Sequence, residues 1–201
     1  ENRHAGLSQI IVDLKNDGVK IRPIRNMAGG EDFNEVVFED VLVPKNRIVG
    51  EPGNGWQQVT SELAYERSGP ERFLSAYRVF AELIRLCGDS PAPHQAAAIG
   101  RLAGHFMTLR RMSLSVAGML EAGKDVVVEA ALVKELGNNF EKLVPEVARL
   151  AVPDIAHTDA AALGLFRQTF DETMLLSPSF TLRGGTREIL RGVIARSLGL
   201  R

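Results

Sequence analysis

The feature that most constrains the fold is a change in the spacing of apolar residues at Pro52-Gly53-Asn54-Gly55. Before this break, β-rich stretches are separated by Gly, Asn and Asp turn signals, so we expect strands at Ser8–Leu14 and Val36–Val43. After it, apolar residues recur every three or four positions, which is the helical period. The chain is therefore predicted to be mainly α, an antiparallel helical bundle preceded by a partial β-sheet segment, with domains at residues 1–53 and 54–201.

Proline and glycine residues divide the helical region. The first helix is expected over about Gly55–Leu86, with a kink at Pro70, whose ring removes a backbone N–H and crowds the preceding turn. A second helix ends at Gly123 and a third is stopped by Pro153. A fourth stretch covers about Asp159–Leu176, and a final helix follows the last pair of glycines. Long antiparallel helices with short connections pack as a bundle.

The charge and composition exclude several classes of function. The balance of 24 Lys and Arg against 25 Asp and Glu gives a formal charge of −1, without a basic run to neutralise a phosphate backbone, so no nucleic acid partner is expected. No stretch reaches the roughly 20 apolar residues of a membrane span, so no membrane contact is expected either. The single Cys87 suits a reducing compartment, which favours a cytoplasmic location. Because the chain opens on Glu1, directly before strand-like sequence, we expect that its beginning is missing.

A helical bundle could hold a di-iron site, which needs Glu-x-x-His motifs on two helices. The only such motif is Glu1 to His4, and Asp154 with His157 is a single acidic counterpart. P-loop, Gly-x-Gly-x-x-Gly and Gly-x-Ser-x-Gly motifs are also absent. The spacings therefore predict no metal site, and phosphate-loop and serine-hydrolase chemistry lose their usual support.

One carboxylate of the first helix falls among apolar positions. On a wheel of about 100° per residue, Glu66 lies about 20° from Val59, on a stripe that also contains Leu74 and Tyr77. Burial there would disfavour the charged form and raise the pKa of the carboxyl group, as suits a general base. The alternative is a structural carboxylate at the edge of the stripe, paired with an arginine such as Arg67. The pattern alone leaves both interpretations open.

Two separated stretches carry more specific motifs. The first is Val36-Val37-Phe38-Glu39-Asp40-Val41-Leu42-Val43-Pro44, followed by Gly50-Glu51-Pro52-Gly53-Asn54-Gly55-Trp56, and the second is Gly184-Gly185-Thr186-Arg187-Glu188-Ile189-Leu190-Arg191. The first is similar to the end of the middle β domain of acyl-CoA dehydrogenases, and the second resembles their C-terminal signature. Both occur in the family's order, with a helical region of fitting length between them. The chain thus resembles the C-terminal part of the middle β domain plus the C-terminal helical domain.

The resemblance implies FAD-dependent conversion of an acyl-CoA thioester to a 2-enoyl-CoA. In the family, a glutamate removes the α proton while the β hydrogen leaves as hydride to the flavin. That glutamate lies either just before the Gly-Thr of the signature, which here is Gly184 and cannot act, or on the first bundle helix, where Glu66 matches. The resemblance therefore assigns the catalytic base to Glu66 and places Arg67 near the substrate, with a surface ion pair as the alternative for Arg67.

The same resemblance names three cofactor contacts. Gly185 and Thr186 match a turn that contacts the flavin, where a missing Cβ permits close approach and a hydroxyl can donate a hydrogen bond. A plain helix start at Thr186 is the alternative. Gln95 weakly matches a glutamine that contacts the flavin of the neighbouring subunit.

Two stretches depart from the family pattern. Arg85-Leu86-Cys87-Gly88-Asp89-Ser90 stands where an Arg-x-x-Phe-Gly turn is usual, and Val152–His157 stands where a glycine-rich turn is usual. These turns normally clasp FAD across a subunit interface. Three hypotheses follow: part of an active dehydrogenase that forms a homotetramer, a subunit of a hetero-tetramer in which only some interfaces hold FAD, or a catalytically degenerate structural subunit. An active enzyme would pass electrons to electron-transfer flavoprotein or a similar acceptor.

Overall fold

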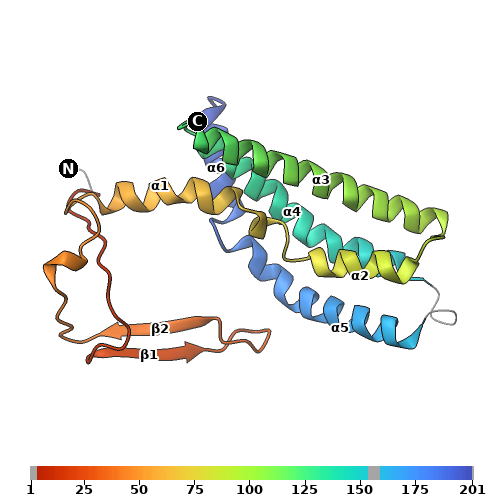
Figure 1. The fold of residues 1–201 in the computed structure, drawn as a ribbon, viewed down its shortest axis with the longest axis horizontal. Helices are drawn as coiled ribbons and strands as arrows, with labels where there is room; N and C mark the ends of the chain where they lie inside the picture. The colour runs from red at the N-terminus through yellow and green to blue at the C-terminus, as the bar shows by residue number, and fades with distance from the viewer. Residues whose placement is uncertain (1–3, 154–158, 201) are drawn as a thin grey trace. The chain divides into compact units, whose positions relative to one another are not determined.

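The computed structural model describes residues 4–153 and 159–200, which form mainly helices (Figure 1). The chain falls into two compact units, residues 1–62 and 63–201. The mainly α class with a small β segment, expected from the sequence, is confirmed. The domain boundary expected after residue 53 stays a prediction.

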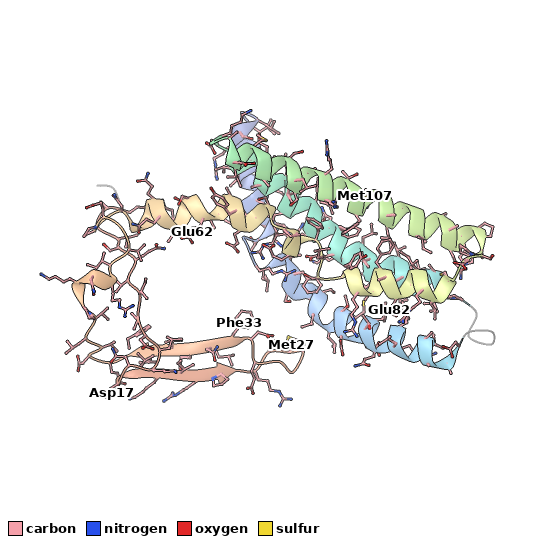
Figure 2. The ribbon with its side chains drawn as sticks, in the orientation of Figure 1. Asp17, Met27, Phe33, Glu62, Glu82 and Met107 are labelled. Atoms are coloured by element: carbon pink, nitrogen blue, oxygen red, sulfur yellow. The ribbon has the colours of Figure 1, made fainter. Side chains whose placement is uncertain are left out.

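The first unit contains a two-stranded antiparallel sheet. Strand β1 (Val19–Ile24) pairs with strand β2 (Phe33–Phe38). Figure 2 shows Asp17 and Met27 at opposite ends of this hairpin. Side chains on both faces are exposed, Phe33 among them, so the hairpin has no core of its own within the described part of the chain. A lone hairpin of this kind is at best marginally stable in water.

The positions of the predicted strands need correction. Ser8–Leu14 is not a strand, because among the described residues it contributes only an isolated bridge between Ile10 and Ile48. The strand predicted at Val36–Val43 is displaced, since β2 ends at Phe38 and Asp40 takes a left-handed φ of 49° that interrupts an extended ladder. Strand β1 is not among the expected strands. It contains Pro23, which lacks an N–H for the ladder and is tolerated where a strand has an unpaired edge.

The second unit is a helical bundle with helix α4 (Val127–Ala151) as its central element. Helices α2 (Tyr77–Cys87), α3 (Pro93–Glu121) and α6 (Arg187–Ser197) pack against α4, and α5 (Ala160–Leu176) packs against α2 (Figure 1). The core includes apolar side chains from α2, α3, α4 and the segment before α2, among them Phe73, Val79, Leu83, Leu102, Phe140 and Val144. Burying each side chain of this kind contributes about 1.5–3 kcal/mol. The bundle predicted from the apolar spacing is therefore present.

The first predicted helix is broken rather than kinked. Helix α1 covers Gly55–Ser68, Gly69 is extended, and a 3₁₀ turn, η2 (Pro70–Arg72), precedes α2. Proline is well suited to the first position of a helical turn but not to its interior, so α1 ends before Pro70. The break leaves Arg72 buried, with its backbone packed on Gly137 of α4.

The C-terminal part returns the chain to α4. The described residues also include the short 3₁₀ turns η1 (Lys45–Arg47), in the first unit, and η4 (Ser177–Thr181), between α5 and α6. In residues 4–153 and 159–200, no helix has both the length and the apolar character needed to cross a membrane.

Candidate active site

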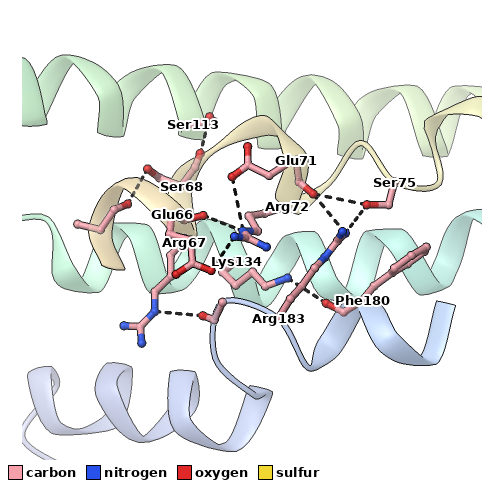
Figure 3. A network of polar contacts seen from close by, with 12 residues as sticks. Glu66, Arg67, Ser68, Glu71, Arg72, Ser75, Ser113, Lys134, Phe180 and Arg183 are labelled. Carbon is pink, nitrogen blue, oxygen red and sulfur yellow. Dashed lines mark hydrogen bonds and ion pairs between the residues drawn. The ribbon is translucent and has the colours of Figure 1, made fainter. Parts of the chain in front are cut away.

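Glu66 lies near the C-terminal end of α1, where Arg72 holds it (Figure 3). Arg72 Nη2 donates a hydrogen bond to Glu66 Oε1 at 2.7 Å, and Arg72 Nε donates to the Glu66 backbone oxygen, also at 2.7 Å. The Glu66 side chain is 42% exposed, whereas that of Arg72 is 9% exposed. The pair therefore joins an accessible carboxylate to a buried guanidinium group.

The prediction that Glu66 lies on an inward apolar stripe is wrong for this chain. Val59, Leu74 and Tyr77 are themselves exposed. Helix α1 ends at Ser68, so Leu74 and Tyr77 no longer follow its rotation. The partner of Glu66 is Arg72 rather than Arg67, which the sequence suggested as the alternative. The break at Gly69-Pro70, and not the helical wheel, decides the surroundings of this carboxylate.

Arg67 is buried against the loop that precedes α6. Its Nε donates a hydrogen bond to the Gly184 carbonyl oxygen at 3.2 Å, across 117 positions of sequence. Burial lowers the pKa of Arg67, and the negative charge of Glu66 opposes that shift. Arg67 is therefore not the exposed ion pair that the sequence left open. It ties the end of α1 to the glycine turn.

Gly184 and Gly185 form a turn that packs against three cationic side chains. Their φ angles are 67° and 98°, in the left-handed region that glycine adopts without strain. A Cβ at Gly184 would lie 3.4 Å from the Arg72 guanidinium and 3.4 Å from Lys134, and one at Gly185 would lie 3.5 Å from Arg67. Arg72 and Lys134 therefore occupy the space on the inner side of Gly184.

Lys134 of α4 is fully buried beside that turn. Its Nζ donates hydrogen bonds to Asn138 Oδ1 at 2.6 Å and to the Phe180 carbonyl oxygen at 3.0 Å. Burial lowers the pKa of Lys134 to about 8, although the negative charge of Glu141 opposes the shift. Sequence reasoning missed this residue. The available signal is the spacing of Lys134, Asn138 and Glu141, which places three polar side chains on one face of a helix whose other buried positions are mostly apolar.

Glu141 is a second buried charge in the same part of the bundle. Its Oε1 accepts hydrogen bonds from the Ser75 backbone N–H at 3.0 Å and from Arg183 Nη2 at 3.1 Å. Arg183 also contacts the Ser75 hydroxyl (Figure 3). Burial raises the pKa of Glu141, and the bonds from Ser75 and the charge of Arg183 oppose that shift. Because buried charges persist when they are paired, this network holds the chain around Arg183 against α4.

The remaining predicted cofactor contacts lie in two different places. Thr186 is the N-cap residue of α6 and adjoins Gly185, but its side chain makes no capping hydrogen bond to the backbone. Gln95 is buried in the first turn of α3, where its Oε1 accepts the Ala92 N–H at 2.9 Å. It lines a pocket of about 550 Å³ that shares no residue with the network around Glu66. The structure therefore brings Gly185 and Thr186 to the end of α1, but not Gln95.

The described ranges contain no group of three or more His, Cys, Asp or Glu side chains arranged to hold a metal ion. Asp154 and His157, which the sequence singled out, lie outside the described residues. So does most of the Val152–His157 segment that departs from the family pattern.

The chain is similar to acyl-CoA dehydrogenases in both sequence and fold. It is 32% identical to the acyl-CoA dehydrogenase IpdE1 of Mycolicibacterium smegmatis, over 98% of this chain and 50% of that protein. Among solved structures, glutaryl-coenzyme A dehydrogenase in complex with glutaryl-CoA matches 98% of this chain and 52% of its own, with a TM-score of 0.80 at 18% identity. The ChsE4–ChsE5 complex from Mycobacterium tuberculosis matches 98% of this chain and 54% of its own, with a TM-score of 0.73 at 23% identity. No family model matches the chain.

The helical bundle matches the C-terminal helical domain of acyl-CoA dehydrogenases. The chain belongs to the acyl-CoA dehydrogenase family. It spans about half the length of the curated relative described above.

Proposed function

We propose that this chain supplies the base-bearing helical bundle of an FAD-dependent acyl-CoA dehydrogenase, which forms a 2-enoyl-CoA from an acyl-CoA thioester. The observation that carries the proposal is Glu66, an accessible carboxylate anchored by Arg72 beside the glycine turn of the C-terminal signature. Of the two carboxylate oxygens of Glu66, only Oε1 accepts a hydrogen bond from another described side chain. Oε2 is therefore available to take the α proton. A positioned carboxylate of this kind contributes about 10²–10⁴-fold to a proton-transfer step.

The other predicted site residues have supporting roles in this proposal. FAD, when bound, supplies the acceptor for the β hydrogen and its electron pair. Gly185 and Thr186 fit one edge of such a group, because they are only half-buried and Gly185 presents backbone without a Cβ. Arg67 holds this turn through the Gly184 carbonyl and lies within the substrate-binding region that the family resemblance implies. Gln95 would contact the flavin of a neighbouring subunit.

The assembly and its partners are part of the same proposal. We propose a homo- or hetero-tetramer in the cytoplasm that passes electrons to electron-transfer flavoprotein or a similar acceptor. The exposed hairpin of the first unit supports a larger β domain in the whole protein, because its apolar side chains have no core among the described residues.

A catalytically degenerate subunit of a hetero-oligomeric acyl-CoA dehydrogenase is the second candidate. It is favoured by Arg85–Ser90, which lacks the aromatic residue of the family's flavin-clasping turn. One protein of similar fold is a complex of two differently named chains, ChsE4 and ChsE5. A flavin absorbance spectrum of the purified full-length protein separates the candidates, since the degenerate subunit alone would carry no FAD. Co-purification with a second, related chain would identify a mixed enzyme.

The base is tested by Glu66→Gln in the full-length protein. Dehydrogenation of the best substrate in a panel of straight-chain, branched-chain and steroid side-chain acyl-CoAs is expected to fall at least about 100-fold. Flavin content should stay unchanged, because the substitution keeps the size of the side chain. Glu62→Gln is the matched control, since Glu62 is an exposed carboxylate one turn earlier in α1, and it should retain full turnover. Near-normal turnover of Glu66→Gln would exclude Glu66 as the base.

A further inference from the structure

We infer that Arg72 is the positioning residue for Glu66, so that orientation of the base depends on one guanidinium group held in the bundle. This inference rests on the proposed function, because it concerns the residue that would take the α proton. It adds a residue outside the matched motifs, which lies on the short 3₁₀ turn after α1.

The contact between the two residues has two points. Arg72 Nη2 binds the Glu66 carboxylate and Arg72 Nε binds the backbone oxygen of the same residue, each at 2.7 Å. Two hydrogen bonds from one rigid, planar group to two parts of one residue restrict both the helix end and the side-chain rotamer. The carboxylate is therefore held by Oε1, and Oε2 points in a direction set by Arg72.

Arg72 is itself held on three sides. Its backbone carbonyl lies on Gly137 of α4, where any Cβ would fall well inside van der Waals contact. Its guanidinium lies against the Cα of Gly184, where a Cβ would be 3.4 Å from Cζ. Glu71 adds a third contact, an ion pair to Arg72 Nε at 3.6 Å. A site built on packed elements in this way keeps the geometry that catalysis requires more tightly than a free side chain does.

The exposure of Glu66 favours a positioning role over a stabilising one. An ion pair with one partner 42% exposed is screened by water and contributes little to folding stability. Arg72 is buried and fixed in place, so its hydrogen bonds fix the position of the accessible Glu66 carboxylate. Loss of the guanidinium should therefore change the alignment of the base more than the stability of the bundle.

The test is a set of four variants in the full-length protein. Arg72→Met removes the guanidinium group. Arg72→Lys keeps the charge but lacks the planar group that binds both the carboxylate and the backbone oxygen of Glu66. Glu66→Gln and the double variant Arg72→Met/Glu66→Gln complete a cycle. Arg149→Met is the control, because Arg149 forms a comparable ion pair with Glu146 at 3.1 Å at an exposed position of α4. Each protein is measured by steady-state kinetics and by single-turnover reduction of the flavin with the acyl-CoA that the wild type reduces fastest.

The expected result is a fall in kcat of about 100-fold for Arg72→Met, with a change in KM of less than about threefold, as for a misplaced catalytic group. Arg72→Lys should recover part of that loss and Arg149→Met should match the wild type. In the Glu66→Gln background, Arg72→Met should cause no further loss, because there is no base left to orient. Circular dichroism and flavin content show whether Arg72→Met folds. If it does not, the role of Arg72 is tested by Arg72→Lys, which should fold and have a kcat below that of the wild type but above that of Glu66→Gln.

Two kinds of failure are distinguishable. The role of Arg72 alone would be overturned if Glu66→Gln were inactive while folded Arg72→Lys and Arg72→Met turned over normally. It would also be overturned if Glu66→Gln were impaired and the losses of the two single variants multiplied in the double variant. Normal turnover of Glu66→Gln, or a wild-type protein whose flavin no acyl-CoA reduces, would overturn the proposed function and the role of Arg72 with it.

Discussion

Replacement of Gly137 by alanine tests the packing that holds Arg72 in place. Gly137 is buried in the middle of α4, and the turn that carries Arg72 crosses it at backbone contact. A Cβ at this position would lie 3.2 Å from the carbonyl carbon of Arg72 and closer still to its oxygen, and 3.5 Å from the Phe73 side chain. Because the obstructing atoms belong to backbone, they cannot move aside as the end of a flexible side chain can.

The magnitude follows from two opposing effects. Alanine in a helix interior is more favourable than glycine by about 1 kcal/mol. Overpacking a tight contact costs about 1–3 kcal/mol, and an obstruction made by a backbone carbonyl belongs at the upper end. Gly137→Ala is therefore expected to lower the free energy of unfolding by about 2 kcal/mol. The displaced turn should also move Arg72, so kcat is expected to fall in the same direction as is expected for Arg72→Met.

The control is the same substitution at Gly100 of α3, where nothing lies within 4 Å of the added Cβ. Gly100→Ala should raise the free energy of unfolding by about 1 kcal/mol. Urea denaturation, followed by far-ultraviolet circular dichroism, measures the free energy of unfolding of both variants. The comparison requires that the dependence of this free energy on urea concentration has the same slope in each protein. A Gly137→Ala protein as stable as the wild type, or stabilised to the same extent as Gly100→Ala, would refute the steric argument.

Two further predictions concern the buried charges. The folded-state pKa of Lys134 is lowered from 10.5 to about 8, which corresponds to about 3 kcal/mol. The free energy of unfolding should therefore rise between about pH 8 and pH 10.5, as the folded state loses a proton that the unfolded state keeps, and urea titrations should show no such rise for Lys134→Met. Burial alone would raise the pKa of Glu135, but hydrogen bonds from Arg187 and Arg191 outweigh it and hold that pKa below 4.5. Glu135→Gln should lower the free energy of unfolding by about 2 kcal/mol at neutral pH, and thermal unfolding should show the difference vanish as pH falls through the lowered pKa. An unchanged difference in acid would contradict this.

The predictable part of the fold follows from short-range pattern. Apolar residues at three- and four-residue spacing, together with Gly123 and Pro153, place α3 and α4 close to their observed bounds. The periodicity failed where a single residue interrupts it. Pro70 ends α1 instead of bending it, and Asp40 follows the end of β2 with a left-handed backbone.

The sequence by itself determined the family, the helical class and the candidacy of Glu66, because these depend on residue identities and spacings within a few turns. Only the tertiary structure decided what surrounds Glu66. Its partner Arg72 is placed by a break in the helix and by contact with Gly137 on another helix, and Arg67 meets Gly184 across 117 positions. The spacing of Lys134, Asn138 and Glu141 places them on one face of α4, but only the packing of α4 at the centre of the bundle buries that face. Contacts between residues so far apart depend on how the helices pack, which no local pattern specifies.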